Sequence, residues 1–261
     1  MDLFVKETGK ENEESIVFIH GGGVSGWMWD KQLKEFTDYH CLVSDLPEHG
    51  KSNDIAPFTM ESAAEQVIEI IKDKAHNKRA HIIGISLGGQ LVVQILSRAP
   101  EVVDHAVIGG TMVRKFWGKT TLNLFMLIVR AFSPIVKTDF AIKQIMKRGI
   151  PLEYFEDYKK SINLITYSAY KHIMDANASF RIPPNLYKAK NLVLITLGEK
   201  ELKPVHESAK DLNKCLSNSK AFMVSDLYHL WNLESPDLFN KTVRAWLNNK
   251  ELLPGELLKI E

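Results

Sequence analysis

The sequence predicts an α/β protein built on a doubly wound, mostly parallel sheet. Short apolar segments rich in β-branched residues alternate along the chain with longer segments of helical periodicity. The short segments are apolar almost throughout rather than at every second position, which is typical of parallel strands covered on both faces. Because strand and helix follow one another in this order, we expect one sheet with helices packed on either side.

Six segments are expected to form strands, and four form the helices between them. The expected strands are 15–20, 40–46, 80–86, 104–110, 191–198 and 220–225. The expected helices are 59–76, 88–98, 204–216 and 235–249. Thr59 precedes the first helix and is a candidate N-cap, because its hydroxyl can accept a hydrogen bond from a free N–H of the first turn.

The stretch from residue 113 to residue 186 interrupts this alternation. It contains helical patterns but no good strand, and Ser133-Pro134, 149–151 and 182–184 are expected to separate its helices. We therefore predict a core formed by residues 1–112 and 187–261, with a helical lid inserted over residues 113–186.

Charge is distributed unevenly between these two parts. The chain has a net charge of +1, yet residues 113–186 contain twelve Lys and Arg against five Asp and Glu. Two interpretations stay open: a solvated lid surface, or a lid that attracts an anionic substrate or carrier. The nearly neutral total argues against a nucleic-acid-binding protein.

The composition indicates an ordinary globular protein without a cofactor. Hydrophobic residues make up 45% of the chain and charged residues 25%. Cys41 and Cys215 are the only cysteines, so no disulfide framework is expected and a cytoplasmic location fits. The amino terminus lacks the apolar segment of a secretory signal, and the apolar run 124–132 is too short to insert stably in a membrane. Metal-ligand, phosphate-loop and dinucleotide motifs are lacking, so neither a metal nor another cofactor is expected.

The segment Gly84-Ile85-Ser86-Leu87-Gly88 has the G-x-S-x-G pattern, between an expected strand and an expected helix. This context predicts a sharp turn whose strained backbone requires neighbours without side chains. Such a turn raises the Ser86 hydroxyl above the sheet and leaves the N–H of Leu87 at a helix N-terminus, where it can stabilise an oxyanion. Ser86 is therefore a candidate nucleophile.

A glycine-rich turn, His20-Gly21-Gly22-Gly23, follows the first strongly apolar strand. Glycines allow a backbone N–H to approach closely the position above Ser86. Gly22 is the expected second oxyanion donor and Gly23 the alternative. The competing interpretation is a structural turn anchored by Trp27 and Trp29. His20 is expected to be a hydrogen-bonded structural histidine rather than the base.

These segments together resemble the α/β-hydrolase superfamily, in its lidded serine-esterase-like branch. The resemblance extends along nearly the whole chain, with 113–186 at the place of the variable lid. It is carried by "FIHGGGVSGWMWD", "DLPEHGKS", "GISLGG", "TLGEKE" and "YHLWNLESPDLF", at residues 18–30, 45–52, 84–89, 196–201 and 228–239.

The resemblance implies a Ser-acid-His triad in the chain order of this superfamily. Ser86 corresponds to the nucleophile and His229 to the base. Glu201 matches the position of the acid, with Glu199 and Glu207 as weaker alternatives. Tyr228 departs from the glycine that the family usually has before this histidine. Gly23, Trp27 and Trp231 are further expected to contact substrate.

The function implied is hydrolysis of a carboxylic ester or thioester through an acyl-enzyme on Ser86. Residues 122–129 are expected either to line an acyl pocket or to pack the lid on the core. An acyltransferase, a C–C hydrolase or a lyase on the same fold stays open, as does a receptor that does not catalyse. The expected partner is a small acyl substrate, with an anionic group left open; a homodimer is also left open.

Overall fold

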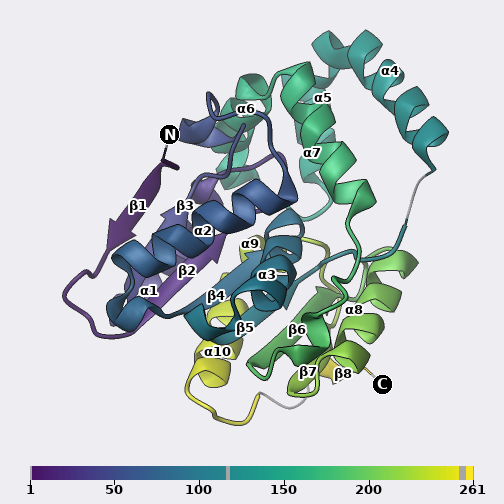
Figure 1. Ribbon diagram of the computed structural model, residues 1–261. Helices are drawn as coiled ribbons and strands as arrows, with labels where there is room; N and C mark the ends of the chain where they lie inside the picture. Colours follow the sequence, from purple (N-terminus) through teal and green to yellow (C-terminus); the bar gives the residue numbers. More distant parts are fainter. Residues whose placement is uncertain (1, 116–117, 253–256, 261) are drawn as a thin grey trace.

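The computed structural model describes residues 2–115, 118–252 and 257–260. At its centre is one eight-stranded sheet in the order β1-β3-β2-β4-β5-β6-β7-β8 (Figure 1). The six inner strands are parallel, and the two edge strands run antiparallel to their neighbours. The strands are β1 (Val5–Thr8), β2 (Ser15–Ile19), β3 (His40–Ser44), β4 (Ala80–Ile85), β5 (Val103–Gly109), β6 (Leu192–Gly198), β7 (Ser219–Val224) and β8 (Leu257–Lys259).

The expected doubly wound α/β fold is confirmed. All six expected strands are present, each within two residues of the expected bounds. The two edge strands, Val5–Thr8 and Leu257–Lys259, were not expected from the sequence. Both are short and pair on one side only, so neither needs the continuous apolar run that marks the inner strands.

Helices cover both faces of the sheet (Figure 1). The buried side chains of α2, α3 and α8 join one apolar cluster, and those of α1, α9 and α10 join a second cluster on the opposite face. Thr59 caps α2 as expected, since its hydroxyl accepts from the N–H of Ser62 at 3.1 Å. These helices are α1 (Asp30–Glu35), α2 (Met60–Lys74), α3 (Leu87–Arg98), α8 (Lys203–Cys215), α9 (Trp231–Glu234) and α10 (Pro236–Leu247).

The alternation of side chains along β2 shows how the two clusters are separated. Val17 and Ile19 belong to the cluster under α2 and α3, whereas Ile16 and Phe18 belong to the cluster under α1 and α10. All four are fully buried, because successive side chains of a strand point to opposite faces and both faces are covered.

Four α-helices lie between β5 and β6, in the stretch expected to form a lid. They are α4 (Lys119–Val136), α5 (Asp139–Met146), α6 (Phe155–Leu164) and α7 (Tyr167–Ser179). The expectation that Ser133-Pro134 ends a helix was wrong, since α4 continues through both residues. Proline's fixed φ is compatible with a helix, and near the end of α4 it costs one hydrogen bond, to the carbonyl of Arg130. The division into core and lid stays a prediction.

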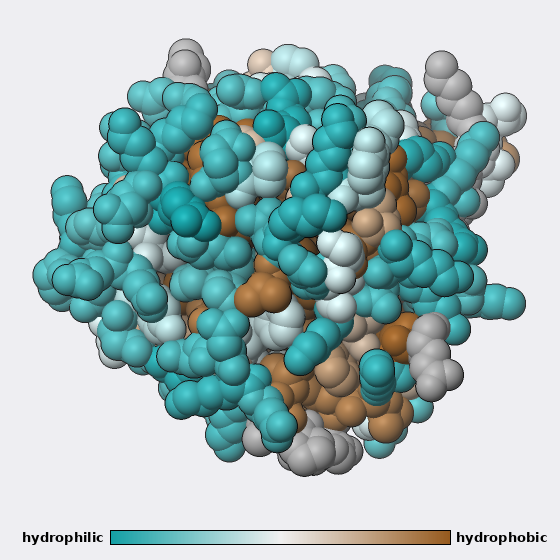
Figure 2. Space-filling model, turned by 60° about the horizontal axis from the view of Figure 1, so that its bottom comes forward, coloured by the Kyte–Doolittle hydropathy of each residue, from teal (hydrophilic) through white to brown (hydrophobic). Residues whose placement is uncertain are grey.

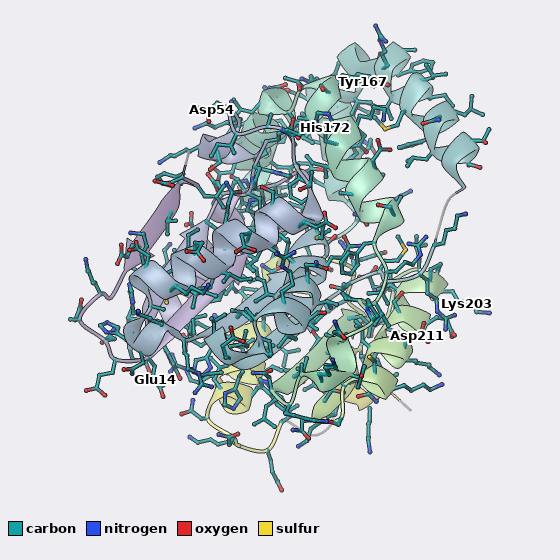
Figure 3. The ribbon with its side chains drawn as sticks, viewed as in Figure 1. Glu14, Asp54, Tyr167, His172, Lys203 and Asp211 are labelled. Atoms are coloured by element: carbon teal, nitrogen blue, oxygen red, sulfur yellow. The ribbon has the colours of Figure 1, made fainter. Side chains whose placement is uncertain are left out.

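Side-chain hydrogen bonds attach this helical segment to the sheet-forming part at several points. At its start, the Arg114 guanidinium pairs with Asp211 of α8 through two hydrogen bonds of 2.5 and 2.8 Å. On α7, His172 Nδ1 lies 2.9 Å from Glu48 Oε1 (Figure 3 labels Asp211 and His172). Gln90 Nε2 of α3 donates to Asn177 Oδ1 of α7 at 3.1 Å. The last two contacts hold α7 against the loop after β3 and against α3.

The surface is mostly polar on the face shown in Figure 2, where hydrophobic residues show in patches between hydrophilic ones. Within the described ranges, no helix is both long and apolar enough to cross a membrane.

Candidate active site

Ser86 occupies a strained turn between β4 and α3. Its φ of 60° and ψ of −117° are unusual for a residue with a side chain. The turn is held by the Ser86 N–H, which donates to the Gly109 carbonyl at 2.8 Å, and by the Thr111 hydroxyl, which donates to the Ser86 carbonyl at 3.3 Å. Ser86 therefore stands, partly exposed, at the carboxyl end of β4, where ligands of open α/β sheets bind.

Two glycines make this turn sterically possible. A Cβ on Gly84 would lie 2.3 Å from the carbonyl oxygen of Gly88, and a Cβ on Gly88 would lie 2.2 Å from that of Ile19. Both distances are too short for any side chain. The G-x-S-x-G spacing is thus required by close packing of α3 against β2 and β4.

His229 and Glu201 come together from the loops after β7 and β6. His229 Nδ1 lies 2.6 Å from Glu201 Oε1, and the Glu201 side chain is 6% exposed. Because a carboxylate only accepts, Nδ1–H is the donor and Nε2 is left with a free lone pair. Burial opposes protonation of the imidazole, but the hydrogen bond and the charge of Glu201 outweigh it, so the pKa of His229 lies above its usual 6.5.

The turn after β5 connects this pair with Ser86. Gly109 accepts from the Ser86 N–H, and the next residue, Gly110, contacts the two other candidate triad residues. A Cβ on Gly110 would lie 2.7 Å from Glu201 Oε1 and 3.0 Å from His229 Nδ1. Gly110 was not identified from the sequence as a residue of the site. The only sequence feature that marks it is the Gly109-Gly110 pair at the end of the expected strand 104–110.

Gly198 explains how the Glu201 and His229 loops come so close. A Cβ there would lie 2.3 Å from the carbonyl oxygens of both Leu227 and Tyr228. The Lys200 N–H also donates to the Leu227 carbonyl at 2.9 Å. Only glycine at the end of β6 leaves room for the histidine loop to lie directly on the loop that carries the acid.

Tyr228, which departs from the family pattern, does not displace the histidine. Its N–H donates to Glu234 Oε1 at 2.8 Å, and its side chain is 36% exposed with the Lys200 ammonium 5.0 Å from the ring centroid. Gly149 leaves room for the side chains of Tyr228 and Glu234 because it has no Cβ. A Cβ there would lie 2.9 Å from Tyr228 Cβ and 2.6 Å from Glu234 Oε1.

The His20–Gly23 turn borders the serine turn. A Cβ on Gly21 would lie 3.4 Å from Ser86 Cβ, and one on Gly22 would lie 3.8 Å from Leu87 Cβ. The Gly23 N–H is engaged, donating to His49 Nε2 at 3.3 Å. Among the described residues the Gly22 N–H has no hydrogen-bond partner, and the Leu87 N–H is the first of α3, without an intrahelical acceptor.

Two buried neutral histidines support this turn. His20 donates from Nδ1 to the Gly21 carbonyl at 2.8 Å and accepts at Nε2 from the Leu46 N–H at 2.9 Å. His49 donates from Nδ1 to the Pro47 carbonyl at 2.8 Å and accepts from Gly23. Burial lowers the pKa of His20 to about 4 and that of His49 to about 3. His20 is thus structural, as expected; the contact of His49 with the turn could not be foreseen.

The two tryptophans expected to contact substrate make packing contacts. Trp27 donates from its indole to Ser161 Oγ of α6 at 2.9 Å, and its ring lies 5.4 Å from that of Tyr154. Trp231 is fully buried, with its ring 4.7 Å from that of Phe239. Their contact with substrate stays a prediction.

Cys41 and Asp45 have structural roles. Cys41 is fully buried, which raises the pKa of its thiol to about 12, so it behaves as a small apolar residue. Asp45 makes local hydrogen bonds, accepting from the N–H groups of Gly26 at 2.7 Å and Lys51 at 2.8 Å. Among the described residues, no cluster of His, Cys, Asp or Glu could hold a metal ion.

A groove of about 700 Å³ lies beside the site rather than at it. It is bordered by the start of α2, by His172 and Ala176 of α7, and by the chain at 180–184. Ser86 and His229 do not line it.

The comparisons with known proteins identify the fold family. Residues 14–203 match the family model described as alpha/beta hydrolase fold. An AB hydrolase superfamily protein of Gibberella zeae is 25% identical over 256 residues, which cover 93% of this chain and 83% of that protein. A pimeloyl-[acyl-carrier protein] methyl ester esterase of Nitrosomonas europaea is 32% identical over 133 residues, 48% of this chain and 50% of the esterase.

The solved structures show the same fold. The enol-lactonase from Burkholderia xenovorans superposes with a TM-score of 0.79 at 20% identity, covering 94% of this chain and 96% of that one. The sheet order, the serine turn after β4 and the family match all lead to the same classification. The chain belongs to the alpha/beta hydrolase fold family and is an enzyme of that superfamily.

Proposed function

We propose that this protein is a serine hydrolase that cleaves a carboxylic ester or thioester through an acyl-enzyme on Ser86. One observation carries the proposal: the 2.6 Å hydrogen bond between Glu201 and His229, which lies beside Gly110, the neighbour of the residue whose carbonyl accepts from the Ser86 N–H. It fixes the imidazole in the tautomer that leaves Nε2 free to accept the serine proton.

The reaction proceeds in two steps. Ser86 Oγ attacks the carbonyl carbon while His229 Nε2 takes its proton, and the carbonyl oxygen becomes an oxyanion. The N–H groups of Gly22 and Leu87 are the donors for that oxyanion. His229 then gives the proton to the leaving alkoxide or thiolate as the bond to it breaks, and the acyl group stays on Ser86.

Water completes the cycle. His229 takes a proton from the attacking water, the second oxyanion collapses, and the proton returns to Ser86 Oγ as the carboxylic acid leaves. Glu201 stays ionised throughout and stabilises the imidazolium. Relatives named as a methyl ester esterase and as an enol-lactonase support an ester substrate.

A C–C bond hydrolase is the second candidate. A 2-hydroxy-6-oxononadienedioate hydrolase of a Pseudomonas species is 33% identical over 113 residues, 41% of this chain. This candidate predicts turnover of a vinylogous diketone with weak activity on simple esters. The ester proposal predicts the reverse.

Intact-mass analysis after treatment with a fluorophosphonate tests the proposal. Wild type should gain the mass of one probe, Ser86→Ala should gain none, and Ser217→Ala, which removes a serine outside the site, should label like wild type. p-Nitrophenyl esters of increasing chain length then identify the acyl group. A wild-type protein that stays unlabelled and inactive would contradict the proposal and leave the receptor interpretation in its place.

A further inference from the structure

The strongest unexplained feature is the outward face of α4. Its large apolar side chains are half exposed or more: Leu124 is 60% exposed, Leu127 59%, Ile128 50%, Phe132 52% and Ile135 58%. Their spacing of three, four and seven residues places them on one side of the helix.

The same helix already has a packed side. Leu122 is 5% exposed and Met126 1% exposed, and the contacts of α4 are with α5 and α7. Leu122 and Met126 therefore attach α4 to the protein, and the stripe from Leu124 to Ile135 points the other way. In Figure 1, α4 lies at the outer edge of the molecule, with α7 between it and the sheet. An apolar stripe that spans twelve residues, about 18 Å of helix, is larger than scattered surface residues explain.

The surroundings of the stripe are strongly basic. Residues 118–152 contain six Lys and Arg and a single acid, Asp139, whose carboxylate is paired with Lys159 at 2.7 Å. The side chains of four of these residues form no ion pair with any residue that the structure describes: Arg130, Lys143, Lys147 and Arg148.

A large apolar side chain and a lysine of α5 share one face with the lysine that caps the helix, Lys147. Phe140 is 75% exposed, and Lys143 and Lys147 follow it at spacings of three and seven residues. An apolar face accompanied by uncompensated cations is the pattern of helices that lie in the interface of an anionic bilayer.

We propose that α4, α5 and the adjoining Lys147 form a docking arm, residues 119–147, that binds the surface of an anionic lipid bilayer. The stripe from Leu124 to Ile135 enters the boundary between headgroups and acyl chains, and Lys143 and Lys147 contact lipid phosphates. A second copy of the chain fits this surface less well, because it would bring two arms of the same positive sign together. The proposal concerns peripheral binding and does not depend on the proposed reaction.

Vesicle sedimentation tests the docking arm, with the Ser86→Ala protein so that no lipid is cleaved. The vesicles are phosphatidylcholine alone, or equal parts of phosphatidylcholine and phosphatidylglycerol. We expect binding to the mixed vesicles at least tenfold tighter than to the neutral ones, and weakened by raised salt.

Paired variants locate the binding surface. Leu127→Ser with Ile128→Ser should weaken binding to mixed vesicles about tenfold or more, because less apolar area is buried. Lys143→Gln with Lys147→Gln should reduce the preference for mixed over neutral vesicles. Leu192→Ser, at a 37% exposed leucine at the amino end of β6, should bind like the parent protein. A thermal melt of each variant shows that it is folded.

Three results would overturn the inference: sedimentation with neither vesicle, equal binding to both, or binding that both paired variants leave unchanged. A dimer in light scattering that dissociates in Leu127→Ser with Ile128→Ser, without vesicle binding, would assign the face to a second copy instead. Fluorophosphonate labelling of Ser86 is unaffected by any of these outcomes, so the two proposals fail separately.

Discussion

Glu201 Oε1 and His229 Nδ1, 28 residues apart in sequence, are joined by a 2.6 Å hydrogen bond. Both groups rest against Gly110, at the turn that also holds Ser86. Glu201 therefore reaches the histidine, because the Glu201 loop and the His229 loop pack on each other through Gly198.

Replacing Glu201 by glutamine should lower kcat on p-nitrophenyl acetate by about 10³- to 10⁴-fold. The amide removes the charge that stabilises the imidazolium and disturbs the tautomer. Glu199→Gln is the matched control, since Glu199 is exposed and its carboxylate accepts only from the Asp226 N–H at 2.9 Å. If Glu199→Gln were the inactive variant and Glu201→Gln the active one, the acid would have been assigned to the wrong residue.

The pH dependence of kcat/KM should report the raised pKa of His229. The base must be neutral, so activity should fall as the pH drops through an inflection above 6.5. In Glu201→Gln the residual activity should show an inflection at lower pH, because the interactions that raise the pKa are lost. Rates measured from about pH 5 to about pH 9 test this; an inflection that stays in place in the variant would contradict it.

Alanine at Gly110 should impair catalysis more than folding. The residue has a φ of +51°, so a side chain costs about 1–2 kcal/mol of unfolding free energy. Its Cβ would also lie 2.7 Å from Glu201 Oε1, which must move away from His229. We expect kcat to fall at least tenfold in a protein that still melts cooperatively.

Gly118→Ala is the control for this substitution. A Cβ there has one neighbour within 4 Å, Thr121 Oγ1 at 4.0 Å. Its kcat and its melting temperature should both resemble those of wild type. Equal losses of activity in the two variants would show that Gly110 has no specific role beside the histidine.

Buried neutral histidines should destabilise the protein in mild acid. Burial lowers the pKa of His20 to about 4, of His49 to about 3 and of His81 to about 4. Between pH 6.5 and these pKa values the unfolded chain binds more protons than the folded protein. The free energy of unfolding therefore falls as the pH falls, by up to about 1.4 kcal/mol per pH unit for each histidine.

His229 has the opposite effect on how stability depends on pH. Its folded pKa is raised, so its contribution to stability is complete below pH 6.5 and is lost as the pH rises through the folded pKa. The free energy of unfolding, measured with urea across this pH range, should decrease overall towards acid pH. His81→Gln should reduce the slope of the unfolding free energy against pH by about one proton. A slope that is unchanged in His81→Gln would exclude His81 as one of its sources.

Local sequence patterns were sufficient for the fold and for parts of the site. Continuous apolar runs located the six inner strands, because a strand buried on both faces tolerates few polar residues. The glycines around Ser86 indicated a strained turn, and the structure has one, with a φ of 60°. The short edge strands and the continuation of α4 through Pro134 were missed, since neither carries a local signal of sufficient strength.

Relations between distant residues were decided by the tertiary structure alone. The sequence by itself determined the order of strands and helices, the strained serine turn and the candidate histidine. Only packing decided that Glu201 reaches His229, that His49 engages Gly23 and leaves the Gly22 N–H free, and that Trp231 is buried. The physical reason is that periodicity and turn chemistry act over a few residues, whereas these contacts depend on which loops the sheet brings to one edge.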